Sequence, residues 1–142
     1  MEPRITLITL GVADLPRAVA FYRDGLGWPT AYQAGQEVAF FDLRGTKLGL
    51  YGMQDLCADI SAATPPPADG FRGITIAHNV RSREEVAAVL VAAERAGGRI
   101  IKPAQDVSWG GHSGYFTDPD GHHWEIAWNP VMPLDETGEM SL

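Results

Sequence analysis

Several features that would point to common functions are scarce in this sequence of 142 residues. It contains one cysteine, Cys57, so no internal disulfide can form and nothing indicates an oxidising compartment. No run approaches the roughly 18 apolar residues of a membrane span. The N-terminus also lacks the basic region and cleavage site of a secretion signal. We therefore expect a cytoplasmic protein that does not associate with membranes.

Basic residues are also few. The 11 lysines and arginines face 18 aspartates and glutamates, which gives a formal net charge of −7. Arg81, Arg83 and Arg95 are spread out rather than clustered, so nucleic-acid binding is not expected. The glycine-rich signatures of nucleotide-binding loops and the G-x-S-x-G signature of serine hydrolases are absent as well.

What is present is an ordinary globular composition, with 45% hydrophobic and 20% charged residues. Alternating and helical apolar patterns predict a mixture of strands and helices. The expected strands are residues 5–12, 30–33, 37–43, 47–51, 73–80, 99–102, 113–117 and 122–128, and the expected helices are residues 14–26, 53–60 and 82–96.

The order β-α-β-β-β occurs twice in this pattern, which predicts an internal repeat. We expect one α+β structural domain made of two βαβββ modules, with helices on the outer face and a cleft between the inner faces. The predicted parts are a first module (residues 1–60), a proline-rich linker (61–70), a second module (71–130) and a loosely held C-terminal tail (131–142).

The segment from Trp109 to Pro130 predicts a β-hairpin around the turn at residues 118–121. In its second strand, Trp124 and Trp128 share one face and Glu125 lies on the other. A carboxylate in the middle of a strand is costly to bury without a partner. We therefore expect Glu125 to face either water or a cleft where its charge is used.

Two motifs resemble the vicinal oxygen chelate superfamily, which includes glyoxalase I, bleomycin-resistance proteins and extradiol dioxygenases. One is Asp-Leu-Pro-Arg-Ala-Val-Ala-Phe-Tyr-Arg-Asp-Gly-Leu-Gly at residues 14–27, and the other is Gly-Tyr-Phe-Thr-Asp-Pro-Asp-Gly-His-His-Trp-Glu at residues 114–125. The resemblance spans roughly residues 5–130. It implies paired βαβββ modules, often assembled as homodimers, around a cleft that commonly holds a divalent metal.

The ligand positions of that metal are only partly kept. The resemblance implies a histidine five residues before Val12 and another five before Val80, but the residues found there are Leu7 and Thr75. Of the implied ligands, Glu125 alone is present, and Gly49 occupies its counterpart in the first module. One carboxylate does not hold a transition metal against water, so no metal or other cofactor is expected, although a divalent metal bound through other residues stays open.

Other residues are candidates for a site around Glu125. His123 shares its face and is a tentative catalytic partner, and His112 either covers the cleft or belongs to a mobile loop. The candidates for substrate binding are Trp109, Tyr115, Thr75, Phe40, Leu7 and Thr117.

Three functions are compatible with these residues. The first is a metal-free protein that binds a small molecule in an apolar cleft, as in the bleomycin-resistance branch. The second is a cofactor-independent enzyme in which Glu125, with or without His123, moves a proton on a small oxygenated substrate. The third is a metal-dependent glyoxalase-like lyase or dioxygenase that uses Glu125, His123 and water. The sequence does not decide whether the protein is an enzyme.

Overall fold

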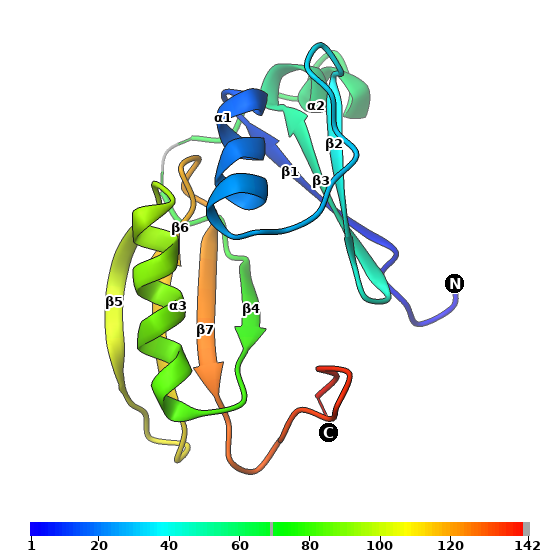
Figure 1. Cartoon of the computed structure of the whole chain (residues 1–142). Coiled ribbons are helices and arrows are strands. Elements are labelled where there is room, and N and C mark those ends of the chain that lie inside the picture. The colour runs from blue at the N-terminus through cyan, green and yellow to red at the C-terminus, as the bar shows by residue number, and fades with distance from the viewer. Residues whose placement is uncertain (69, 141–142) are drawn as a thin grey trace. The chain divides into compact units, whose positions relative to one another are not determined.

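The computed structural model describes residues 1–68 and 70–140, and the chain divides into two compact units, Met1–Gly70 and Phe71–Leu142. Each unit contains one β-sheet (Figure 1). The elements of the first unit are β1 (Leu7–Val12), α1 (Leu15–Ala20), the π-helical turn η1 (Phe21–Gly25), β2 (Val38–Leu43), β3 (Thr46–Gly52) and α2 (Met53–Ile60). Those of the second unit are β4 (Thr75–Asn79), α3 (Arg83–Arg95), β5 (Arg99–Asp106), β6 (His112–Thr117) and β7 (His123–Trp128).

The first unit is a three-stranded sheet with the order β1-β3-β2, in which β1 runs parallel and β2 antiparallel to β3. Asp14 caps the first turn of α1, since its carboxylate accepts a hydrogen bond from the Arg17 amide at 2.9 Å. Buried residues of the helical segment and the sheet form the core of this unit: Ala18, Val19, Phe21, Tyr22, Ala39, Phe41, Leu48 and Leu50.

The strand predicted at residues 30–33 does not form, and only an isolated bridge joins Thr30 to Phe41. The Thr30 side chain explains the difference, because its hydroxyl donates to the Phe40 carbonyl at 2.7 Å. The same hydroxyl oxygen accepts a hydrogen bond from the Tyr32 amide at 3.2 Å. Side-chain bonds of this kind compete with a regular strand ladder, so the first module has one strand fewer than expected.

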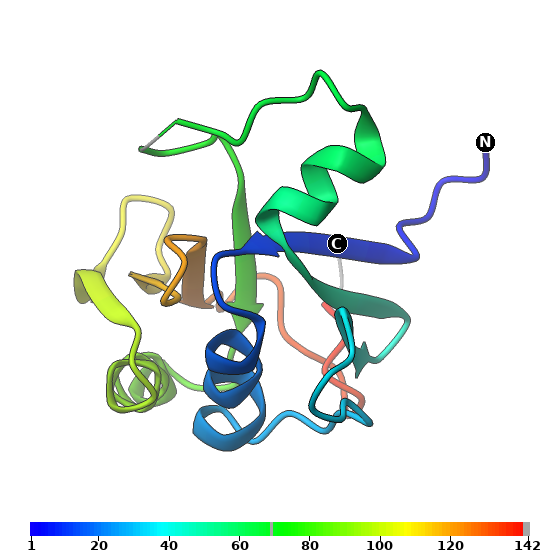
Figure 2. The same cartoon turned by 90° about the horizontal axis from the view of Figure 1, so that it is seen from above.

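The second unit is a four-stranded sheet with the order β4-β7-β6-β5, and α3 packs on one of its faces (Figure 2). The hydrophobic side of α3 meets the sheet through buried residues of the helix and strands: Val86, Leu90, Ala93, Phe116, Trp124 and Ile126. Trp124 is therefore part of the core between α3 and the sheet. With the three strands of the first unit, the seven strands confirm the predicted α+β fold with two related modules.

The turn predicted at residues 118–121 connects β6 to β7. The Asp118 carboxylate accepts hydrogen bonds from the amides of Asp120 and His122 at 3.0 and 2.9 Å. Gly121 has a φ of 84°, in the left-handed region that favours glycine. This turn sets the register that places Tyr115 opposite Glu125.

Two sets of side-chain hydrogen bonds lie near the ends of elements in the second unit. At the start of α3, the Ser82 side chain makes no capping bond, and the Glu85 carboxylate accepts from the Arg81 amide. The Arg81 guanidinium donates to the carbonyls of Leu134, Asp135 and Glu136, within the segment predicted as a C-terminal tail. Residues 141 and 142 of the predicted tail, and residue 69 of the predicted linker, lie outside the described residues.

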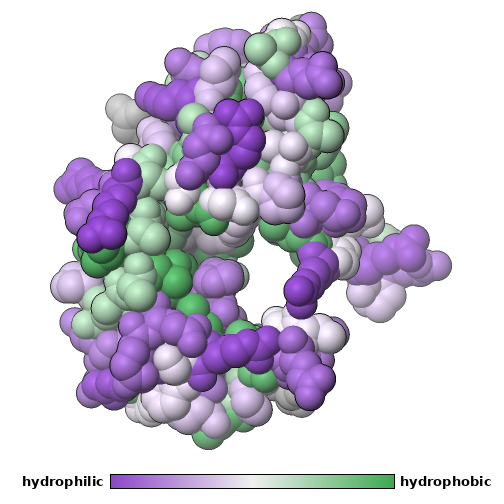
Figure 3. All heavy atoms as spheres, viewed as in Figure 1, coloured by the Kyte–Doolittle hydropathy of each residue, from purple (hydrophilic) through white to green (hydrophobic). Residues whose placement is uncertain are grey.

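Hydrophilic residues dominate the visible surface (Figure 3), in keeping with the acidic composition. Among the described residues, no helix is both long and apolar enough to cross a membrane.

Candidate functional site

The face of the second sheet opposite α3, called the open face below, carries most of the candidate site. Side chains that are paired in register project from the same face, so the register of the four strands gives the layout. One row across the sheet is Thr75, His123, Thr117 and Arg99, and the next row is Ala77, Glu125, Tyr115 and Lys102. A polar surface therefore lies on a sheet whose other face is buried under a helix.

Glu125 lies near the middle of this open face. It is half-buried, and its neighbours across the strands are Ala77 of β4 and Tyr115 of β6. The Tyr115 hydroxyl makes a hydrogen bond to the Glu125 carboxylate. Since an ionised carboxylate only accepts, the phenol is the donor. Burial, followed by this bond and by the charge of Glu125, raises the pKa of Tyr115.

Lys102 of β5 was not among the sequence candidates. Its Nζ lies 5.3 Å from the centre of the Tyr115 ring, within the range of a cation–π contact. The sequence alternation gives no sign of this, because irregularities in β5 on either side of Lys102 change which face the side chain takes.

His123 lies in the neighbouring row, between Thr75 and Thr117. Its ring meets the edge of Phe71 with the ring centres 5.0 Å apart. Phe71 was also missed by the sequence reasoning, because it precedes β4 and belongs to no periodic pattern. Thr75, Thr117, Tyr115, His123 and Glu125 are thus brought together on one face.

Leu7 and Phe40 belong to the first unit, where they share a face of that sheet with Gly49. Both are exposed, at 42% and 54%. A β-carbon placed on Gly49 would lie 3.4 Å from Leu7 and 3.5 Å from Phe40, so the missing side chain leaves the two apolar residues close to one another. The same face also carries Thr9 and the ion pair of Lys47 with Asp42, so the two apolar side chains lie among polar ones.

Trp109 is not part of the polar rows. It lies in the turn between β5 and β6, which is closed by a hydrogen bond from the Val107 amide to the Gly111 carbonyl at 3.1 Å. A β-carbon on Gly111 would overlap the Trp109 indole, at 1.7 Å. The ring therefore folds back over Gly111 while 48% of the residue stays exposed.

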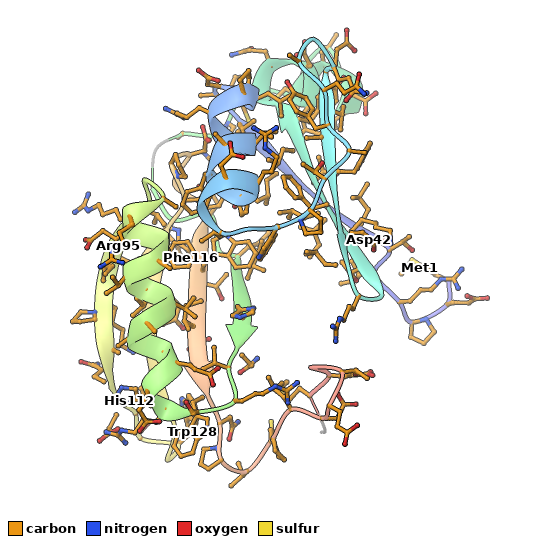
Figure 4. All side chains as sticks on the ribbon, viewed as in Figure 1. Met1, Asp42, Arg95, His112, Phe116 and Trp128 are labelled. Carbon is orange, nitrogen blue, oxygen red and sulfur yellow. The ribbon has the colours of Figure 1, made fainter. Side chains whose placement is uncertain are left out.

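Two other histidines, His112 and His78, face away from Glu125. The His112 side chain lies on the face opposite that of Ser113 and Tyr115. This is the α3 side of the sheet, where His112 lies next to Trp128 (Figure 4). Its Nδ1 donates to the Asp106 carboxylate at 2.8 Å, so it neither covers the open face nor belongs to a mobile loop. His78 pairs with Ile126, also on the α3 side, where burial lowers its pKa and nearby Glu85 partly offsets that change.

The residues around Glu125 do not fit a transition metal. Its neighbours across the sheet offer a methyl group and a phenol that already donates to it, and Thr75 supplies only a neutral hydroxyl. Within residues 1–68 and 70–140, no three histidine, cysteine, aspartate or glutamate side chains gather in a way that could hold an ion. His123 and Glu125, two residues apart on one strand, are the only strong donors in these two rows of the described sheet.

Comparison with known proteins places this geometry in context. Residues 4–126 match the sequence profile of the Glyoxalase/Bleomycin resistance protein/Dioxygenase superfamily. A glyoxalase-related enzyme from Fulvimarina pelagi shares 36% sequence identity, with a TM-score of 0.87 and coverage of 99% of this chain and 98% of that one.

More distant structures share the fold. A lactoylglutathione lyase from Agrobacterium tumefaciens is 23% identical with a TM-score of 0.68, covering 92% of this chain and 97% of that one. A glyoxalase/bleomycin resistance protein/dioxygenase from Nocardioides is 24% identical with a TM-score of 0.74, covering 90% and 84% respectively. The resemblance expected from residues 14–27 and 114–125 is confirmed, and the chain belongs to the Glyoxalase/Bleomycin resistance protein/Dioxygenase superfamily, the vicinal oxygen chelate group.

Proposed function

We propose that this protein binds a small molecule on the open face of its second sheet without the help of a metal. The observation that carries the proposal is the Glu125 carboxylate, which is half-buried among strands and bonded to the Tyr115 hydroxyl. A partly desolvated carboxylate is costly unless its oxygens are satisfied. Tyr115 occupies part of its accepting capacity, and the rest is available to a donor group of a ligand.

The surroundings suit such a ligand. Thr75 and Thr117 offer hydroxyl groups beside His123, and the edge of Phe71 adds an aromatic surface. Leu7, Phe40 and Trp109 remain proposed ligand contacts on the ground that they are exposed apolar side chains.

A second candidate function is acid–base catalysis, and the same hydrogen bond favours it. A Glu125 carboxylate whose orientation is set by Tyr115 is suited to take a proton from a substrate group placed beside it. His123, two residues away on the same face, would be the second proton-transferring group. In this reading the protein is an enzyme that acts on a small oxygenated substrate.

Replacing Glu125 by Gln tests the proposal and separates the two functions. A library of small molecules is first screened by NMR for compounds that shift the amide resonances of β6 and β7. A binding protein should then keep its affinity for neutral ligands within about tenfold in Glu125→Gln. A proton-transfer enzyme should lose turnover by roughly 100-fold to 10,000-fold. The proposal would be contradicted if every compound that binds shifts amide resonances outside β6 and β7 and if Glu125→Gln changes neither binding nor turnover.

We also propose that the protein is a cytoplasmic homodimer. The support is the family membership, since proteins of this superfamily are often dimers. Analytical ultracentrifugation of the purified protein measures the assembly directly, and a monomer at micromolar concentration would contradict it.

A further inference from the structure

The strand β5 departs from regular pairing on both sides of Lys102. Arg99 and Ile100 pair with Thr117 and Phe116, but Lys102, not Ile101, pairs with Tyr115. The next pair is Gln105 with Ser113, so three steps along β5 match two along β6. These are β-bulges, in which an additional residue on one strand changes the direction of the side chains that follow.

The first bulge decides where the Lys102 side chain lies. In an uninterrupted strand, Lys102 would share a face with Ile100, whose partner Phe116 is buried on the α3 side. The additional residue, Ile101, shifts the alternation, so Lys102 takes the face of Arg99 and Tyr115 instead. The consequence is that Lys102 is a half-buried residue whose ammonium group lies over the Tyr115 ring, on the open face.

Lys102, Tyr115 and Glu125 occupy successive strands of one row. Lys102 and Glu125 are therefore two strand spacings apart, or about 10 Å. Opposite charges at the two ends of a row, with a phenol between them, form a surface that distinguishes the two ends of a ligand. The ammonium covers the Tyr115 ring, so Tyr115 contributes its hydroxyl to this surface and not a free ring face for stacking.

We propose that Lys102 is a ligand-binding residue and that the ligand carries an anionic group, such as a carboxylate or a phosphate, at the end away from Glu125. This proposal rests on the proposed function of the open face and names the class of ligand that it takes. The acidic chain as a whole repels anions, with a formal net charge of −7. Arg99, in the next row of β5, adds a second positive charge to the same edge.

Two matched probes test the inference. para-(Aminomethyl)benzoate carries an ammonium group and a carboxylate at opposite ends of a flat ring, and para-(aminomethyl)benzamide replaces the carboxylate by a neutral amide. Binding is measured by NMR from the amide resonances of β5, β6 and β7. We expect the benzoate to bind about tenfold more tightly than the benzamide, the size of one charge-assisted hydrogen bond.

Three variants assign the preference to Lys102. Lys102→Met keeps the apolar stem and should abolish the preference without changing the affinity for the benzamide. Lys102→Arg should retain the preference. Lys47→Met removes an equal charge from the first sheet, where Lys47 pairs with Asp42, and should behave like the unmodified protein.

The possible results separate this inference from the proposed function. Equal binding of both probes, or a preference that survives in Lys102→Met, overturns the role of Lys102 while the open face stays a binding surface. Absence of any shift in β6 and β7 with either probe contradicts both proposals. A preference lost equally in Lys47→Met shows general electrostatic attraction and also overturns the role of Lys102.

Discussion

Gly114 shows how closely a single residue is constrained beneath the open face. A β-carbon at this position would lie 2.6 Å from Leu90 of α3 and 2.8 Å from the backbone carbonyl oxygen of Lys102. The second contact is with a backbone atom, which cannot move away by a rotamer change as a side chain can. The strand β6 therefore accepts only glycine where the helix and the irregular part of β5 converge.

We expect Gly114→Ala to lower the free energy of unfolding by about 1–3 kcal/mol, as overpacking of a closely packed region does. Denaturant unfolding followed by circular dichroism measures the change. Gly49→Ala is the matched control, since its nearest neighbour would be the Thr9 hydroxyl at 3.1 Å and no backbone atom is among its close contacts. Equal stability losses in the two variants would contradict the explanation from backbone crowding.

Tyr115 reports the hydrogen bond that the proposed function depends on. Its pKa is raised above 10.0, first by burial and then by its bond to Glu125 and the charge of that residue. In Glu125→Gln the burial remains and the charge is removed. We therefore expect the pKa of Tyr115 to fall but to stay above its ordinary value.

NMR titration of the tyrosine ring carbons measures this change. Tyr51 is an internal control, because its pKa is raised by burial and by the aspartates Asp55 and Asp59 of α2. An unchanged pKa of Tyr115 in Glu125→Gln would mean that the two side chains do not interact in solution.

At this scale the sequence predicted the site in part. Period-two alternation along β6 and β7 was enough to place Tyr115 and Thr117 on the face of Glu125 and His123, because both strands are regular. Lys102 was missed because a β-bulge has no reliable sequence signature. His112 was left undecided, since a loop of glycines does not show where the strand begins; β6 starts at His112 itself and so fixes its face.

At the scale of elements, the side chains of Arg83, Asp106 and His112 connect α3 to the hairpin of β5 and β6. Asp106 at the end of β5 accepts from Arg83 at 2.6 Å and from His112 at 2.8 Å. The Arg83 bond, followed by the His112 bond, holds the pKa of Asp106 below its ordinary value of 3.8. These contacts join the beginning of the helix to the end of the sheet where His112 and Trp128 lie (Figure 4).

A carboxyl group whose pKa is depressed by folding stabilises the folded state at pH values above its unfolded pKa. That stabilisation is lost as the pH falls through the folded pKa. We therefore expect Asp106→Asn to be less stable than the unmodified protein at neutral pH, with the difference shrinking below about pH 4. Urea unfolding across this pH range measures it, and salt should reduce the difference because Asp106 is exposed.

Asp42→Asn is the control, because Asp42 belongs to the first unit, where it pairs with Lys47. A stability difference for Asp106→Asn that persists unchanged into acid would show that the lost charge is not its cause.

Element positions were predicted well where hydrophobic periodicity was strong, as in α3 and in the hairpin of β6 and β7. The strand expected at residues 30–33 failed for a local reason, the two hydrogen bonds of the Thr30 hydroxyl. Ser82 and Glu85 have the spacing of a capping box, but Glu85 accepts from the Arg81 amide, one residue before Ser82. In both places a side chain competes for backbone groups in a way that spacing alone does not show.

At the scale of the whole molecule, the chain has the fold of its family. Leu7, Thr75 and Gly49 stand at three of the ligand positions that the resemblance implies, and Glu125 faces Tyr115. Each unit contains a sheet and at least one helix, and the site that we propose lies on the second. Membership of the family therefore identifies the scaffold, while the ligand class is what we propose from the side chains of the open face.

We expect protein purified without chelators to contain far less than one equivalent of zinc, iron or manganese, because two adjacent donors on one strand bind such ions weakly. Elemental analysis by mass spectrometry measures the content. Treatment with EDTA should leave the melting temperature unchanged. A stoichiometric ion that survives dialysis and is lost in Glu125→Gln would contradict the expectation.

The hydrogen bonds of Arg81 have a practical consequence for work on this protein. They tie residues 134–136 to the loop between β4 and α3, and the Asp135 carboxylate closes a small turn there by accepting from the amides of Thr137 and Glu139. An affinity tag fused to the C-terminus would begin close to this anchored turn. The six residues before β1 include no strand or helix, which makes the N-terminus the better place for a tag or a surface linkage.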